Sequence, residues 1–190
     1  MQRLYPEDAK KILLDMLRCF AKSCDELNIP YAIDAGTLLG SCRNQTFILH
    51  DYDVDVVVFD VNQFLEVVRK MAKAGFGYNR DGILHYQCVK FAAYNWNDSR
   101  TDCLKPTMDV FLFRCEGGKA EPFSDTARKR WPKWWYLEEN MFPLGEHKFE
   151  GMTLKGAREP EEYLERMYGD WKTPDRTFGP KDNIEVNPPR

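Results

Sequence analysis

The segment from residues 51 to 59, in which aspartates alternate with valines, constrains the fold of this chain most. Asp51, Asp53 and Asp55 follow a period of two, and side chains at positions i, i+2 and i+4 of a strand share one face. The valines between them favour a strand over Val54–Phe59 whose apolar face packs in the core. Three like charges on one face cost free energy unless the carboxylates are solvated, protonated or bound to a cation. The segment therefore predicts a core strand that begins at an acidic site.

A second apolar strand, Met108–Phe113, contains one aspartate, Asp109, for which packing gives no reason. If the two strands are neighbours, Asp53, Asp55 and Asp109 converge. Convergent carboxylate oxygens are hard ligands suited to Mg²⁺ or Mn²⁺. Solvated aspartates at a strand end are the simpler interpretation of any one of these residues. Their number favours a divalent metal site instead.

The segment Gly36-Thr37-Leu38-Leu39-Gly40 precedes the aspartates by about 15 residues. It follows a short strand candidate, Tyr31–Asp34, and can open a helix. Backbone N–H groups at a helix start, together with a threonine hydroxyl, can bind a phosphate. An ordinary tight turn is the alternative. Beside the aspartates, the segment predicts a phosphate pocket that faces a metal site.

The remaining patterns predict a mixed architecture, α/β or α+β, with a mixed central β-sheet flanked by helices. They predict helices over residues 6–27, 61–74 and 160–168, strands over 76–80 and 83–94 joined by a turn at 81–82, a loop over 95–105 and a hairpin around 149–154. Three tryptophans at 131, 134 and 135 are more typical of a core or an interface than of a ligand platform. A chain of 190 residues has the length of one domain. We assign residues 1–175 to that domain and 176–190 to a proline-containing tail.

Composition excludes several classes of function. The chain has 27 Lys and Arg against 30 Asp and Glu, which argues against a broad basic surface for nucleic acid. No stretch approaches the roughly 20 apolar residues of a transmembrane helix, and the first residues lack the apolar core of a signal peptide. We therefore expect a cytoplasmic protein, unless the sequence is a fragment of a longer one. Six cysteines without a C-x-x-C pair and three scattered histidines predict reduced, mostly packed thiols rather than a zinc site.

In combination, these motifs resemble the LicD, fukutin and fukutin-related protein family. The resemblance rests on G-T-L-L-G-S-C-R at residues 36–43, on F-I-L-H-D-Y-D-V-D-V at 47–56, and on F-P-L at 142–144, F-E-G at 149–151, Y-L at 163–164 and Y-G-D-W at 168–171 with Pro174. It spans about Leu27 to Pro174. Two residues depart from the family pattern: His50 stands where tryptophan is frequent, and Tyr52 replaces the middle aspartate. The two aspartates expected to bind metal are retained.

The resemblance implies a nucleotidyltransferase-like fold and a LicD-type phosphotransferase, within the broad class of enzymes that transfer phosphorus-containing groups. Such an enzyme moves phosphocholine or a polyol phosphate from a CDP-activated donor, of the CDP-choline or CDP-ribitol type, to a sugar hydroxyl of a glycan. CMP leaves. Asp53, Asp55 and Asp109 would hold Mg²⁺ or Mn²⁺, while Gly36 and Thr37 would contact the donor phosphates.

Four further residues have open roles. Arg43 can bind phosphate oxygens through its guanidinium fork or form a surface salt bridge. Lys90 can reach a donor phosphate, although extension of its ammonium group to water is the simpler interpretation. Asp51 is either a general base for the acceptor hydroxyl or a residue that orients the metal ligands. His50 can do the same work, although a lone histidine is more often packed or solvated.

Three other functions fit parts of the pattern. A nucleotidyltransferase that adds NMP to a small molecule or protein would use the same carboxylates. The Asp53-Val54-Asp55 motif also fits the D-x-D of a glycosyltransferase, although D-x-D alone is a weak signal. The Tyr52 departure gives slight support to a non-catalytic nucleotide-binding relative. The half of the donor that reaches the acceptor distinguishes the first of these from a phosphotransferase.

Overall fold

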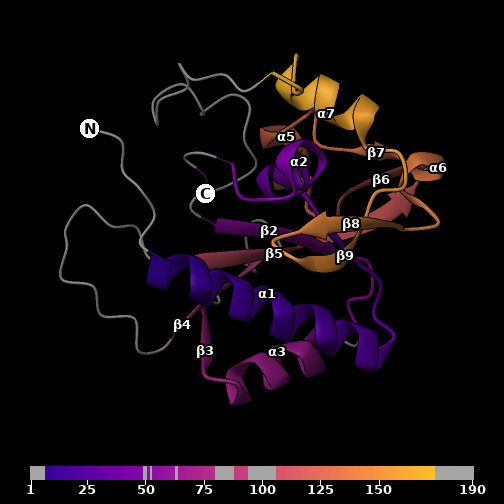
Figure 1. Ribbon diagram of the computed structural model, residues 1–190. Helices are drawn as coiled ribbons and strands as arrows, with labels where there is room; N and C mark the ends of the chain where they lie inside the picture. Colours follow the sequence, from indigo (N-terminus) through magenta and orange to yellow (C-terminus); the bar gives the residue numbers. More distant parts are fainter. Residues whose placement is uncertain are drawn as a thin grey trace.

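The computed structural model describes residues 7–48, 51, 53–62, 64–79, 88–93 and 106–173 (Figure 1). Its helices are α1 (Glu7–Leu27), α2 (Ala35–Asn44), α3 (Phe64–Lys73), α5 (Asp125–Arg130), α6 (Glu138–Met141) and α7 (Glu161–Tyr168). Its strands are β1 (Tyr31–Ile33), β2 (Asp53–Val58), β3 (Phe76–Asn79), β4 (Cys88–Ala93), β5 (Thr107–Glu116), β6 (Lys119–Pro122), β7 (Tyr136–Leu137), β8 (Gly145–Phe149) and β9 (Met152–Gly156).

The described strands form one mixed sheet and a separate hairpin. The main sheet has the order β1-β2-β5-β4-β3, and β6 and β7 extend it beyond the second half of β5. β2 and β5 run parallel, whereas β1 pairs with β2, and β4 with β5, in antiparallel fashion. β8 and β9 pair only with each other among the described strands. The predicted mixed α/β architecture is therefore confirmed, and its one parallel pair places two aspartate-bearing strands side by side.

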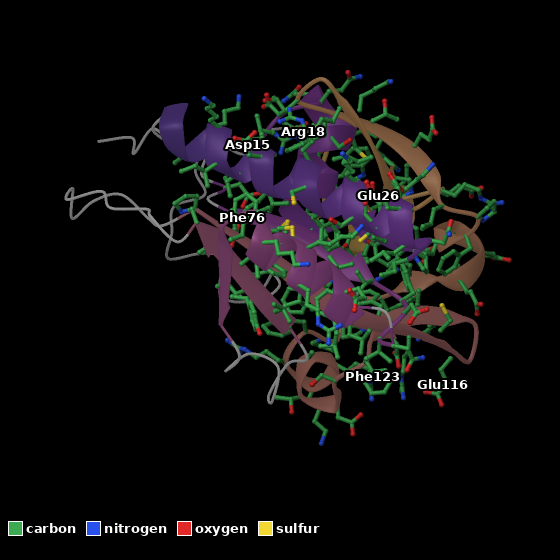
Figure 2. The ribbon with its side chains drawn as sticks, turned by 90° about the horizontal axis from the view of Figure 1, so that it is seen from below. Asp15, Arg18, Glu26, Phe76, Glu116 and Phe123 are labelled. Atoms are coloured by element: carbon green, nitrogen blue, oxygen red, sulfur yellow. The ribbon has the colours of Figure 1, made fainter. Side chains whose placement is uncertain are left out.

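Helix α1 covers the sheet because its apolar residues recur at helical spacing. Leu13, Leu17 and Phe20 are buried, and the helix packs against α3, β4 and β5. Asp15 and Arg18 lie on its outer side and are joined by a 3.0 Å hydrogen bond (Figure 2). In Figure 1, α2 and α7 lie on the opposite side of β2 from α1. β2 therefore lies between α1 on one side and α2 and α7 on the other, and its aspartates are half-buried or buried.

Most predicted elements are present, with shifted ends. The first strand ends at Ile33, one residue early, and α3 begins at Phe64 rather than at residue 61. β5 runs from Thr107 to Glu116, longer than predicted, because its second half pairs with β6. Sequence patterns did not predict β6, β7, α5 or α6, which are short. The turn at 81–82, the loop at 95–105 and the tail at 176–190 lie outside the described residues, so the division into domain and tail stays a prediction.

Trp131 and Trp134 belong to the core, as predicted, whereas Trp135 is half-buried beneath the cationic groups of Lys119 and Arg166. Trp134 is buried, and its ring meets those of Phe111 and Phe113 edge-on at centroid distances of 4.7 and 5.2 Å. Trp131 packs edge-on against Trp134 at 5.8 Å. The described cysteines, at positions 19, 24, 42, 88 and 115, are free thiols. The cluster therefore fixes the segment after α5 onto β5, which carries Asp109 at its other end.

Candidate functional site

Three carboxylates meet where the parallel strands β2 and β5 begin. Asp55 lies directly opposite Asp109 in the ladder, and Asp53 lies opposite Thr107. One carboxylate oxygen from each of Asp53, Asp55 and Asp109 lies within 4.8 Å of the others. The expected convergence of the three aspartates is thus confirmed, while their role toward a metal stays a prediction.

Burial makes this cluster electrostatically costly. The exposed fraction is 6% for Asp55 and 1% for Asp109, whereas Asp53 is half-buried. Burial, followed by repulsion from Asp53 and Asp51, raises the pKa of Asp55 well above its usual range. Burial also raises the pKa of Asp109 to about 7, against the opposing effect of Lys90. Without a cation, the folded protein therefore favours protons on Asp55 and Asp109.

The two oxygens of Asp109 have different surroundings. Lys90 faces Asp109 across the β4–β5 ladder, and its Nζ lies 2.7 Å from Asp109 Oδ2. Asp109 Oδ1 is buried and has no hydrogen-bond partner among the residues that the structure describes. Lys90 thus neutralises one side of the carboxylate and leaves the other side able to bind a cation. Its predicted contact with a donor phosphate stays a prediction.

The start of α2 is attached to β2 at the same point. Asp34 is the N-cap residue of α2 directly after β1, and its N–H donates to the Asp55 carbonyl at 3.0 Å. Thr37 Oγ1 accepts a 3.0 Å hydrogen bond from the Asp55 N–H. The first turn of α2 therefore lies beside the acidic cluster, and it presents the positive end of the helix dipole there. The Thr37 hydroxyl is buried and stabilises the strand, a role that sequence reasoning missed, and its contact with phosphate stays a prediction.

Gly36 has a packing role that the sequence did not indicate. A Cβ atom at position 36 would lie 2.1 Å from Asp51 Oδ2, so any larger residue would displace that carboxylate. Asp51 is half-buried and follows the loop after α2. Gly36 thus lets Asp51 approach the start of α2, close to the strand that carries Asp53 and Asp55. All four predicted aspartates belong to one corner of the fold.

Comparison with known proteins identifies the family of this chain. A family model described as LicD/FKTN/FKRP, nucleotidyltransferase domain, matches residues 28–157. The chain belongs to this family. The match runs from the residue after α1 to the residue after β9, and it includes all the predicted site residues. The resemblance and the nucleotidyltransferase fold expected from the sequence are therefore confirmed.

Individual relatives of this LicD-family chain are distant. An uncharacterized protein of Rickettsia prowazekii (strain Madrid E) is 27% identical over 148 residues, which cover 76% of this chain and 49% of that protein. The ribitol-5-phosphate transferase FKTN of Homo sapiens is 26% identical over 188 residues, 94% of this chain and 38% of that protein. The chain spans less than half the length of these curated relatives. A crystal structure of the lincosamide antibiotic adenylyltransferase LnuA, bound to lincomycin, aligns over 85% of both chains with a TM-score of 0.49 and 12% identity.

Arg43 of the family motif lies away from the acidic cluster along α2. It is seven residues beyond Gly36, which corresponds to about 10 Å of helix rise. Its Nε is buried without a partner in the described part of the chain, and burial lowers the pKa of its guanidinium group. The structure thus brings Gly36 and Thr37 to the cluster but places Arg43 at the far end of the same helix. The role of Arg43 toward phosphate stays a prediction.

Asp34 is a buried carboxylate that sequence reasoning missed. Its exposed fraction is 1%. Trp134 Nε1 donates to Asp34 Oδ2 at 2.7 Å, and the Tyr136 hydroxyl donates to Oδ1. Burial raises the pKa of Asp34, and hydrogen bonds from Tyr136, from the Ala35 N–H and from Trp134 oppose that rise. The only sequence signal was a charge after an apolar strand, because its partners lie about 100 residues away.

The donor set fits a hard divalent cation. Three carboxylates within ligand distance of one another, one of them with a buried, unpartnered oxygen, are the groups that Mg²⁺ and Mn²⁺ prefer.

None of the described helices combines the length with the apolar composition that a membrane span requires.

Proposed function

We propose that this chain catalyses metal-dependent transfer of a phosphorylated group, of the phosphocholine or polyol phosphate type, from a CDP-activated donor to a sugar hydroxyl of a glycan. The observation that carries the proposal is the cluster of Asp53, Asp55 and Asp109, with an unpartnered Oδ1 on Asp109. Membership in the LicD family supports a transferase. The similarity to a ribitol-5-phosphate transferase supports the class of group transferred.

Asp53, Asp55 and Asp109 would hold Mg²⁺ or Mn²⁺. The bound cation would neutralise charge on the donor diphosphate as it builds up. Lys90 would keep Asp109 oriented through Oδ2, so that Oδ1 faces the cation. The N–H groups in the first turn of α2 would add hydrogen bonds to phosphate oxygens.

The proposed transfer forms one bond, breaks one bond and releases one proton. The acceptor hydroxyl oxygen forms a bond to the phosphorus of the transferred group. The bond from that phosphorus to the bridging diphosphate oxygen breaks, and CMP leaves with the electron pair. Asp51, held against Gly36, is the carboxylate proposed to accept the proton of the hydroxyl.

A donor assay tests this proposal. The protein is incubated with CDP-choline, CDP-ribitol or CDP-glycerol, a panel of sugar acceptors, and Mn²⁺ or Mg²⁺. Mass spectrometry should show an acceptor that has gained choline phosphate or a polyol phosphate, with CMP released in equal amount. EDTA should stop the transfer, and readdition of Mn²⁺ should restore it. Undiminished transfer in EDTA would contradict the role of the metal.

Nucleotidyl transfer is the second candidate, because the matched family domain is described as a nucleotidyltransferase domain. The same carboxylates would serve it. The same mass spectra decide between the two functions, since an acceptor that gains the mass of a nucleotide would support this alternative. Nucleoside triphosphates are therefore included as donors beside the CDP compounds.

A further inference from the structure

Tyr168 ends α7, eleven residues beyond the last residue of the family match. Its ring packs against the core, and its hydroxyl is buried without a hydrogen-bond partner in the described part of the chain. Buried tyrosine hydroxyls normally find a partner, because an unpaired one loses its hydrogen bonds to water. The fold therefore keeps a hydrogen-bonding group here that stability alone does not explain.

The surroundings of this hydroxyl are acidic. After burial, the carboxylates of Asp55, Asp34, Asp51 and Asp53, in decreasing order of effect, raise the pKa of Tyr168 well above its usual range. Three of these four carboxylates belong to the candidate site. Helix α7 also lies on the same side of β2 as α2 (Figure 1). The phenol thus feels the charge of the acidic corner and stays protonated at neutral pH, so it can donate a hydrogen bond but cannot act as a base.

Tyr163, on the same helix, provides an internal comparison. Its hydroxyl is also buried without a hydrogen bond that meets geometric criteria. Its ring stacks on Tyr136 at a centroid distance of 4.0 Å. After burial, Asp34 and Tyr168 have the largest effects in raising its pKa. Tyr163 therefore belongs to the aromatic packing around Asp34, whereas Tyr168 is influenced most by Asp55.

We propose that the Tyr168 hydroxyl binds the nucleotide donor by donating a hydrogen bond to one of its phosphate oxygens. This inference rests on the proposed function. With the site carboxylates bound to a cation, a diphosphate presents several further anionic oxygens that can accept a hydrogen bond. Tyr168 would then add a hydrogen-bond donor from α7, which lies on the same side of β2 as α2.

Isothermal titration with CDP in the presence of Mn²⁺ tests the assignment on the full chain. Tyr168→Phe removes only the hydroxyl and should weaken CDP binding by about 10- to 100-fold, as expected for a hydrogen bond to a charged group. The melting temperature of the ligand-free variant should equal or exceed that of the wild type, because an unpaired buried group is lost. Tyr163→Phe, the matched control, should bind CDP within about twofold of the wild type.

The outcomes separate this inference from the proposed function. Wild-type affinity for CDP in Tyr168→Phe would overturn the inference and leave the proposed function intact. Equal weakening in both variants, with lowered melting temperatures, would overturn it by showing a general packing effect. If the wild type binds ATP or UTP instead of CDP, the CDP donor is wrong, and the same comparison with that nucleotide decides the role of Tyr168. A wild type that binds no nucleotide would overturn both.

Discussion

Two buried carboxylates, Asp34 and Asp109, lie in neighbouring parts of this fold but differ in how their oxygens are hydrogen-bonded. Each has an exposed fraction of 1%. Both oxygens of Asp34 accept hydrogen bonds from the core side chains Trp134 and Tyr136. Asp109 has Lys90 on one oxygen and no described partner on the other, and it adjoins Asp55, which is crowded by like charges.

The difference distinguishes a structural charge from a binding charge. A buried carboxylate that is fully hydrogen-bonded stabilises the surrounding fold, and removal of it leaves its donors unpaired. Carboxylates that repel one another and keep an unpartnered oxygen destabilise the fold until a cation arrives. One backbone hydrogen bond, from the Asp34 N–H to the Asp55 carbonyl, joins the two groups. A variant of the acidic cluster should therefore lose activity without losing stability, whereas a variant of Asp34 should lose stability.

The largest effect is expected for Asp55→Asn. Loss of one charge from the cluster should lower the transfer rate by about 1,000-fold or more, equivalent to about 4 kcal/mol in the activation barrier. The free energy of unfolding in EDTA should stay the same or rise, because repulsion from Asp53 and Asp51 is relieved. Steady-state transfer rates and urea denaturation measure the two quantities. Full activity, or a clear loss of stability with retained activity, would contradict a binding role for Asp55.

Asp34→Asn should show the reverse pattern. An asparagine offers one acceptor oxygen in place of two, so either Trp134 or Tyr136 loses its partner, and the free energy of unfolding should fall by about 2–4 kcal/mol. Asp109→Asn is the matched control, because Asp109 is equally buried but has one oxygen without a described hydrogen-bond partner. In EDTA at pH 8 it should be as stable as the wild type or more so. The comparison fails if the two variants lose the same stability in urea denaturation.

The pH dependence of stability gives a smaller effect. The pKa of Asp109 is about 7 in the fold and about 3.9 in an unfolded chain, so between these values the native state holds a proton that the unfolded state has released. Stability of the metal-free protein should therefore fall as pH rises toward 7, with a contribution from Asp109 of up to about 1.4 kcal/mol per pH unit. Urea denaturation in EDTA from pH 5 to 8 measures the slope. Asp109→Asn should flatten it, and parallel profiles would refute the assignment.

Sequence patterns predicted the cluster of Asp53, Asp55 and Asp109 far better than they predicted the hydrogen-bonded carboxylate of Asp34. Asp53 and Asp55 alternate within one strand, and Asp109 interrupts a second, so local periodicity exposes all three. Only the pairing of β2 with β5 had to be assumed. Asp34 forms its partnerships with residues about 100 positions away, and no local pattern encodes such contacts. The clustered carboxylates show in the sequence because each interrupts or alternates with the apolar residues of its own strand.

The same limit applied to the Gly36-Thr37 turn at the start of α2. Gly and Thr at a helix start are typical of phosphate sites, and the sequence therefore assigned Gly36 and Thr37 to the donor. The structure gives each an additional contact within the protein, to Asp51 and to the Asp55 N–H. These contacts span a loop and a strand pairing, so they depend on tertiary structure rather than on spacing. A motif can thus locate a site correctly without giving the contact that each residue makes.

The smallest effect concerns the hydrogen bond that joins Thr37, in α2, to the backbone of Asp55, in β2. Thr37→Val keeps the shape of the side chain but leaves the buried Asp55 N–H without its acceptor at 3.0 Å, so the free energy of unfolding should fall by about 1–2 kcal/mol. Because that N–H fixes the strand beneath the Asp55 carboxylate, Mn²⁺ affinity measured by titration should also fall, by a few-fold. Thr37→Ser retains the hydroxyl and should restore both quantities. Unchanged Mn²⁺ affinity in Thr37→Val, with reduced stability, would show that the acidic cluster keeps its geometry independently of α2.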